Sequence, residues 1–139
     1  MKSFAWGENF PVTFPDGTFV ADYLHIITAD ETPAVPSDFD RAEGEGTFTS
    51  AQVDTSKLNA FPFFGKLTQI NVVTARAGFT EPIYRYSENT QFGLFRFQPI
   101  GLRYFGTSFD LIVLGFPIYF IVKEDAAVLV NQVLRSMGY

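Results

Sequence analysis

Residues 111–138 read "LIVLGFPIYFIVKEDAAVLVNQVLRSMG", in which a twelve-residue apolar run is followed directly by a helix-like segment. A membrane-spanning helix needs about 20 apolar residues, and Gly115 and Pro117 interrupt this run, so it does not predict a membrane span. It predicts instead one bent core strand, or two short strands at 111–114 and 118–122. Apolar residues on both faces indicate that each face of this segment is buried. We expect the core of the sheet to bury one face, and the terminal helix or a neighbouring chain to bury the other.

The segment from residue 123 to about 137 predicts an α-helix. Glu124 and Asp125 lie at its start, where the helix dipole favours negative charge, and Arg135 and Gly138 lie at its end. Helical spacing places an apolar stripe on one face, made of Ala126, Val130, Val133, Leu134 and Met137. We expect this stripe to pack against a sheet.

The composition favours strands over helices in the rest of the chain. Phe is abundant, with 17 residues beside six Tyr, and eight Pro and 11 Gly supply turns. Many strands followed by one helix are typical of an α+β protein. We therefore predict a single, mostly β domain over 1–139, an antiparallel sheet sandwich or partly closed barrel with the C-terminal helix packed on it.

Alternation and turn residues predict where the strands lie. The expected strands are 18–28, 46–54, 66–78, 82–87, 91–98 and 100–105, in addition to the C-terminal run. The segment 55–65 is expected to form a turn or a short helical piece. Both faces of 18–28 are largely apolar, which indicates a strand that is covered on both sides.

The net charge of −5 is concentrated in one segment, and we expect a long acidic loop at about 29–46. Asp38 and Asp40 begin as a calcium-binding EF-hand loop would, but Ala42 and Glu43 break that pattern. A solvated loop or a protein-contact arm is the favoured interpretation, with an irregular calcium site as the alternative. The absence of a basic patch argues against nucleic-acid binding.

The residues needed for common catalytic chemistry are scarce. Cysteine is absent, and the single histidine, His25, lies between apolar neighbours. We interpret His25 as a hydrogen-bonded histidine within a sheet, with a general base as the lesser alternative. Asp22, in an expected strand, and Asp110, beside one, are the acids considered for a catalytic pair, and nothing in the sequence places them across a cleft. We predict no catalytic, cofactor-binding or metal-ligating residues and no cofactor.

An aromatic cluster near the C-terminal half is the remaining candidate site. It contains Phe92, Phe95, Phe97, Tyr104 and Phe105, with Arg96 and Arg103 between them. Such stripes are most often core, and a platform that stacks sugars or bases is the alternative.

These observations favour a non-enzymatic structural or assembly subunit of a larger protein complex, such as a virus or phage particle component. Its expected partners are other protein subunits, as a homo- or hetero-oligomer, with no nucleic acid and no membrane insertion. The alternative is a small β-barrel that binds an apolar small molecule; a small hydrolase that uses His25 ranks third. Residues 1–10 lack the apolar run of a secretory signal, so we expect synthesis in the cytoplasm.

Overall fold

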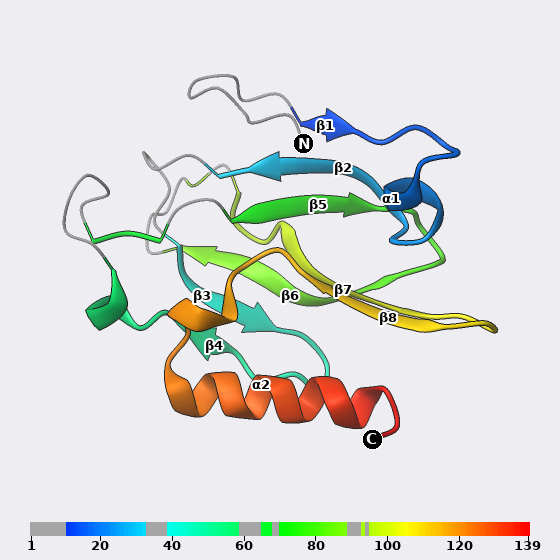
Figure 1. The fold of residues 1–139 in the computed structure, drawn as a ribbon. Coiled ribbons are helices and arrows are strands. Elements are labelled where there is room, and N and C mark those ends of the chain that lie inside the picture. Colours follow the sequence, from blue (N-terminus) through cyan, green and yellow to red (C-terminus); the bar gives the residue numbers. More distant parts are fainter. Residues whose placement is uncertain (1–10, 33–38, 59–64, 68–69, 89–92, 94) are drawn as a thin grey trace.

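The computed structural model describes residues 11–32, 39–58, 65–67, 70–88, 93 and 95–139. The fold is mostly β, with two antiparallel sheets and one C-terminal helix, which confirms the predicted class. One sheet has the order β1-β2-β5 and the other, which curls into a half-barrel, has the order β4-β3-β6-β7-β8. In Figure 1 the C-terminal helix α2 runs along the β3–β4 side of the larger sheet, away from the smaller sheet.

The strands of the two sheets are not grouped along the chain, since β3 and β4 lie between β2 and β5. The smaller sheet contains β1 (Val12–Thr13), β2 (Ile26–Glu31) and β5 (Asn71–Ala75). The larger sheet contains β3 (Phe39–Gly44), β4 (Ala51–Gln52), β6 (Glu81–Glu88), β7 (Pro99–Phe105) and β8 (Asp110–Leu114). The helices are α1 (Phe19–Asp22), α2 (Lys123–Ser136) and two 3-10 turns, η1 (Thr55–Lys57) and η2 (Ile118–Phe120).

Aromatic side chains fill the main core inside the larger sheet. The ring of Tyr84 on β6 meets Phe48 and Phe116 edge-on, with centroids 5.7 and 5.6 Å apart, while Tyr86 packs on Phe39. Edge-to-face pairs of this kind add stabilisation beyond the area they bury. Three of the Phe residues, Phe39, Phe48 and Phe116, thus help to fill the curled sheet.

The Tyr84 hydroxyl is buried and has no hydrogen-bond partner in the described part of the chain. Burial raises the pKa of Tyr84 to about 12, because the phenolate would be poorly solvated there. In the unfolded chain the same group titrates near 10.0.

We expect the free energy of unfolding to fall as the pH rises from about 10 to about 12, because only the unfolded chain releases the Tyr84 proton in this window. The contribution of Tyr84 to the free energy of unfolding is fully present below pH 10, and roughly 2 kcal/mol of this contribution is lost by pH 12. Tyr84→Phe should match the wild type within about 1 kcal/mol at pH 7, since it removes a hydroxyl without a partner. Urea unfolding at a series of pH values tests this, and an equally steep alkaline loss in Tyr84→Phe would contradict it.

Gly115 joins the two sheets just beyond β8. Its N–H donates to the Ile100 carbonyl of the larger sheet, and its carbonyl accepts from the Asn71 N–H of the smaller sheet, both at 2.7 Å. A Cβ at this position would lie 2.1 Å from the Asn71 carbonyl oxygen. Only glycine therefore permits this close approach.

A second, smaller core fills the space between the sheets. Val73 of β5 and Ile26 of β2 pack here against Leu102 of β7 and Val113 of β8. On the other face of β8, Ile112 and Leu114 pack against the main core. Both faces of β8 are thus covered, as the sequence predicted, but the second cover is the smaller sheet and not the terminal helix.

Helix α2 confirms the predicted helix and closes the β4 edge of the larger sheet. The N–H of Gln52 donates to the Asp125 carboxylate at 2.9 Å, and the Gln132 amide bonds Thr47 and Thr49. Leu129 is its buried residue, with Ala126 and Val133 packed beside it. The predicted stripe was partly wrong, because Val130 and Leu134 are exposed.

The predicted strand at 18–28 is wrong in its first half. Thr18 caps α1 by accepting a hydrogen bond from Ala21 N, so the chain turns helical at Phe19. His25 then adopts a left-handed backbone, with φ 54°, before β2 begins. The predicted 91–98 strand is also wrong over its described part, since 95–97 form a turn in which Phe97 has φ 64°.

Other predicted elements differ from the observed ones in their length or in their type of secondary structure. The expected acidic loop at 29–46 is largely strand, because β2 extends to Glu31 and β3 occupies Phe39–Gly44; residues 33–38 lie outside the described chain. The 46–54 and 66–78 strands are reduced to β4 and β5, while η1 bears out the helical piece expected in 55–65, of which 59–64 is not described. Residues 118–120 form η2 instead of a second strand, although Ile121 makes an isolated bridge to Val53.

None of the helices in the described residues is long and apolar enough to cross a membrane.

Candidate interaction site

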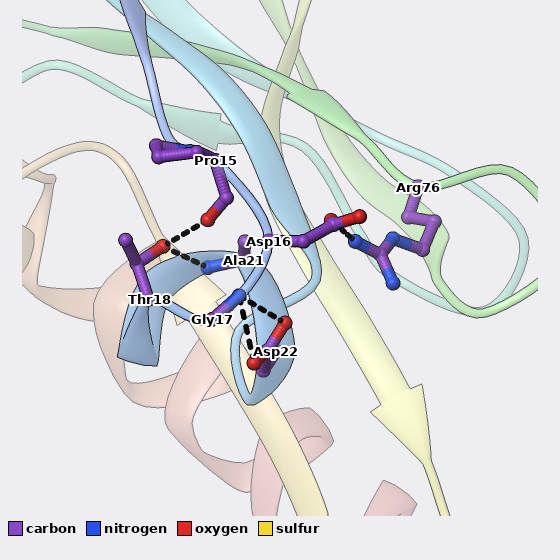
Figure 2. A network of polar contacts seen from close by, with 7 residues as sticks. All are labelled: Pro15, Asp16, Gly17, Thr18, Ala21, Asp22 and Arg76. Atoms are coloured by element: carbon purple, nitrogen blue, oxygen red, sulfur yellow. Dashed lines mark hydrogen bonds and ion pairs between the residues drawn. The ribbon is translucent and has the colours of Figure 1, made fainter.

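A network of polar contacts fixes the short helix α1 and the turn before it (Figure 2). The Thr18 hydroxyl donates to the Pro15 carbonyl at 2.8 Å and accepts from the Ala21 N–H at 3.3 Å. The N–H of Gly17 donates to the Asp22 carboxylate, and Arg76 from the end of β5 forms an ion pair with Asp16. The helix is thereby tied to the smaller sheet, which fixes the direction of its aromatic side chains.

Six rings form a continuous chain of contacts beside this network, named the aromatic row below. They come from α1, the start of β2, the β5–β6 turn and the β7–β8 hairpin. Between neighbouring centroids, the distances are 5.3 Å for Phe19–Tyr23, 6.2 Å for Tyr23–Phe109, 5.2 Å for Phe109–Tyr104, 4.3 Å for Tyr104–His25 and 5.2 Å for His25–Phe79. In Figure 1, α1 and the tip of the β7–β8 hairpin lie toward the same side of the molecule.

The aromatic row is largely open to solvent. Phe19 is 66% exposed, Tyr23 53%, Phe79 53% and Phe109 38%. Isolated exposed apolar residues are normal on a protein surface, but contiguous ones mark sites of interaction. Three exposed rings in direct contact, Phe19, Tyr23 and Phe109, therefore make this the candidate site, and Phe79 is exposed at the far end of the row.

His25 lies beneath the exposed part of the row and is buried, with 7% of its surface accessible. Neither ring nitrogen has a hydrogen-bond partner among the residues that the structure describes, so the predicted hydrogen-bonded histidine is wrong. No carboxylate or hydroxyl of the described residues engages the ring, and the arrangement lacks the contacts of a general base. Its left-handed backbone adds strain of about 1–2 kcal/mol.

Two ion pairs flank the row. Arg76 pairs with Asp16 on one side, and Arg103 pairs with Glu81 at 2.6 Å across β6 and β7. The guanidinium of Arg103 also lies over the ring of Phe105, 5.2 Å from its centroid. Charges of both signs rim an aromatic centre, which is the usual arrangement of a protein interface.

The structure disperses the aromatic cluster that the sequence predicted. Phe95 packs on Tyr86 at the main core, Phe97 is exposed beside Arg96, and Tyr104 belongs to the aromatic row. Phe92 lies outside the described residues. The structure therefore assembles no single stacking platform from the described members of that cluster.

The acidic candidates Asp22 and Asp110 are adjacent in sequence to Tyr23 and Phe109, whose ring centroids lie 6.2 Å apart. Asp22 accepts the Gly17 N–H, and Asp110 is exposed at the start of β8. Asp40 lies on β3, and one of its carboxylate oxygens is buried without a partner among the described residues; Asp38 is not described. No group of potential metal ligands occurs in the part of the chain that the structure describes.

A cavity of about 330 Å³ lies over the other face of the smaller sheet. Thr28, Asp30, Thr74 and Gln98 line it together with apolar residues such as Val72. Ligand pockets for apolar molecules are lined mainly by apolar and aromatic side chains. The mixed lining gives no support to the predicted apolar ligand, which stays a prediction.

Comparisons of the chain with protein-family models, with curated proteins and with solved structures found no match.

Proposed function

We propose that this protein is a non-enzymatic structural or assembly subunit that binds other protein subunits through the aromatic row. The observation that carries the proposal is the run of three exposed rings in direct contact, Phe19, Tyr23 and Phe109, with exposed Phe79 at the far end of the same row. Aromatic residues are enriched in protein interfaces and supply much of their binding energy. A virus or phage particle is the kind of assembly in which we expect such a subunit.

The strained backbone and the buried imidazole of His25 support a functional interpretation of the same surface. Strained backbone and buried polar groups without partners concentrate at functional sites, because elsewhere they only reduce stability. His25 combines both features directly beneath Phe79, whose ring stacks on it at 5.2 Å. The coincidence of both features at one residue beneath exposed rings favours a functional role for this surface.

We expect the double variant Phe19→Ser and Tyr23→Ser to weaken self-association about tenfold or more, because interface aromatics often contribute above 1.4 kcal/mol each. Both side chains are exposed, so the monomer should stay folded. Sedimentation velocity over a concentration series measures the association, and circular dichroism checks the fold.

Phe97→Ser is the matched control, since Phe97 is 60% exposed but lies outside the aromatic row. It should associate as the wild type does. Equal association of all three proteins would show that the row does not mediate binding.

A further inference from the structure

We propose that β8 is a strand-addition site for a second copy of this chain, with the two β8 strands antiparallel around a two-fold axis at Ile112. The inference rests on the proposed function and names one of its partners. The observation behind it is that, among the strands of the described residues, β8 ends the larger sheet and pairs with β7 alone.

The register with β7 determines which backbone groups of β8 are open. Gly115 N donates to Ile100 O, and Gly106 N donates to Phe109 O, so residues 109 and 115 face β7. Hydrogen-bonded and non-bonded residues alternate along an antiparallel ladder. Residues 111 and 113 therefore face β7 as well.

The other residues of β8 point their N–H and C=O groups away from β7, namely Asp110, Ile112 and Leu114. In the part of the chain that the structure describes, no hydrogen bond reaches these groups from the open side. An open row of this kind is a template for another strand.

The apolar side chains of β8 are half-buried and pack within the chain. Ile112 and Leu114 pack into the main core, and Val113 packs into the smaller one. Both faces of the strand are thus occupied within the chain, and the open feature is its backbone edge. Such an edge selects a partner by main-chain pairing.

Two copies of β8 match each other in one register. A two-fold axis at Ile112 sets Ile112 opposite its copy and Asp110 opposite Leu114, so all three open residues are paired. A shift by one residue sets open groups against groups that β7 already uses. A register that pairs Asp110 with its own copy is disfavoured, because it places like charges opposite each other.

The residues that flank β8 also suit a second copy. Phe109 is exposed before the strand, and Ile118 and Tyr119 are exposed after it. An antiparallel pair brings the start of one strand alongside the end of the other. The exposed apolar residues at the two ends are thereby brought toward one another, where association can bury them.

The test uses two single-cysteine variants of the full chain, which has no cysteine of its own. Asp110→Cys and Leu114→Cys are mixed and oxidised mildly. We expect a disulfide between the two variants, because paired residues have Cα atoms about 5.5 Å apart, within disulfide range. Either variant alone should stay uncrosslinked, since each residue lies about 14 Å along the strand from its own copy.

A second variant, Asp110→Pro, removes an open N–H at an exposed strand start. It should weaken self-association about tenfold, because each copy loses a hydrogen bond, whereas Asp110→Asn should associate normally. The inference is overturned if the chain associates but the mixture crosslinks no better than either variant alone; the proposed function then stands. A chain that never associates overturns both.

Discussion

Gly115→Ala is expected to lower the free energy of unfolding by about 3 kcal/mol. The new Cβ would lie 2.1 Å from the Asn71 carbonyl oxygen, a backbone atom that cannot move without separating the two sheets. The hydrogen bonds from Gly115 to Ile100 and Asn71 would weaken together. Urea denaturation at neutral pH measures the change.

Gly46→Ala is the control for Gly115→Ala, because it tests the cost of replacing a glycine where the new Cβ meets no steric clash. Gly46 has φ 63°, but a Cβ there would meet nothing within 4 Å. Its substitution should cost about 1–2 kcal/mol, the usual penalty for a left-handed residue. If Gly115→Ala cost no more than Gly46→Ala, the close approach of the two sheets at Gly115 would be contradicted.

Leu129→Ala is expected to destabilise the protein by about 3 kcal/mol. Leu129 is the buried residue of α2 and packs into the main core against the larger sheet. Its removal leaves a cavity where the helix meets the sheet. Thermal or urea unfolding should show the loss as one cooperative transition.

Leu134→Ala is the matched substitution on the same helix. Leu134 is 46% exposed, so its truncation should change the free energy of unfolding by no more than about 0.5 kcal/mol. The stripe inferred from the sequence included Leu134 and omitted Leu129. Equal losses from the two variants would support that stripe over the observed packing.

The helix and the β class could be predicted because both depend on local pattern. Residues 123–137 carry helical spacing with charges that suit each end, and α2 begins and ends within a residue of that prediction. The first half of the 18–28 strand could not be predicted from alternation. Its course is decided by the Thr18 cap and by the left-handed backbone of His25, neither of which changes hydrophobic periodicity. The Asp16-Gly17-Thr18 sequence was the available signal for a helix start.

The aromatic row could not be predicted because its rings come from four segments. Phe19 and Phe109 are 90 positions apart and share the row only through Tyr23. The sequence did indicate that His25 would be buried, but a ring without partners is a property of the packed structure. Similarly, the sequence predicted two covers for residues 111–114, and only the fold shows that the smaller sheet is the second.

The central claim, that this chain is an assembly subunit, is tested most directly by the molar mass of the unmodified protein. Sedimentation equilibrium over the micromolar range should show a mass that rises with concentration from the 15.6 kDa chain toward a dimer or larger species. A stable, monodisperse monomer across that range would contradict the claim.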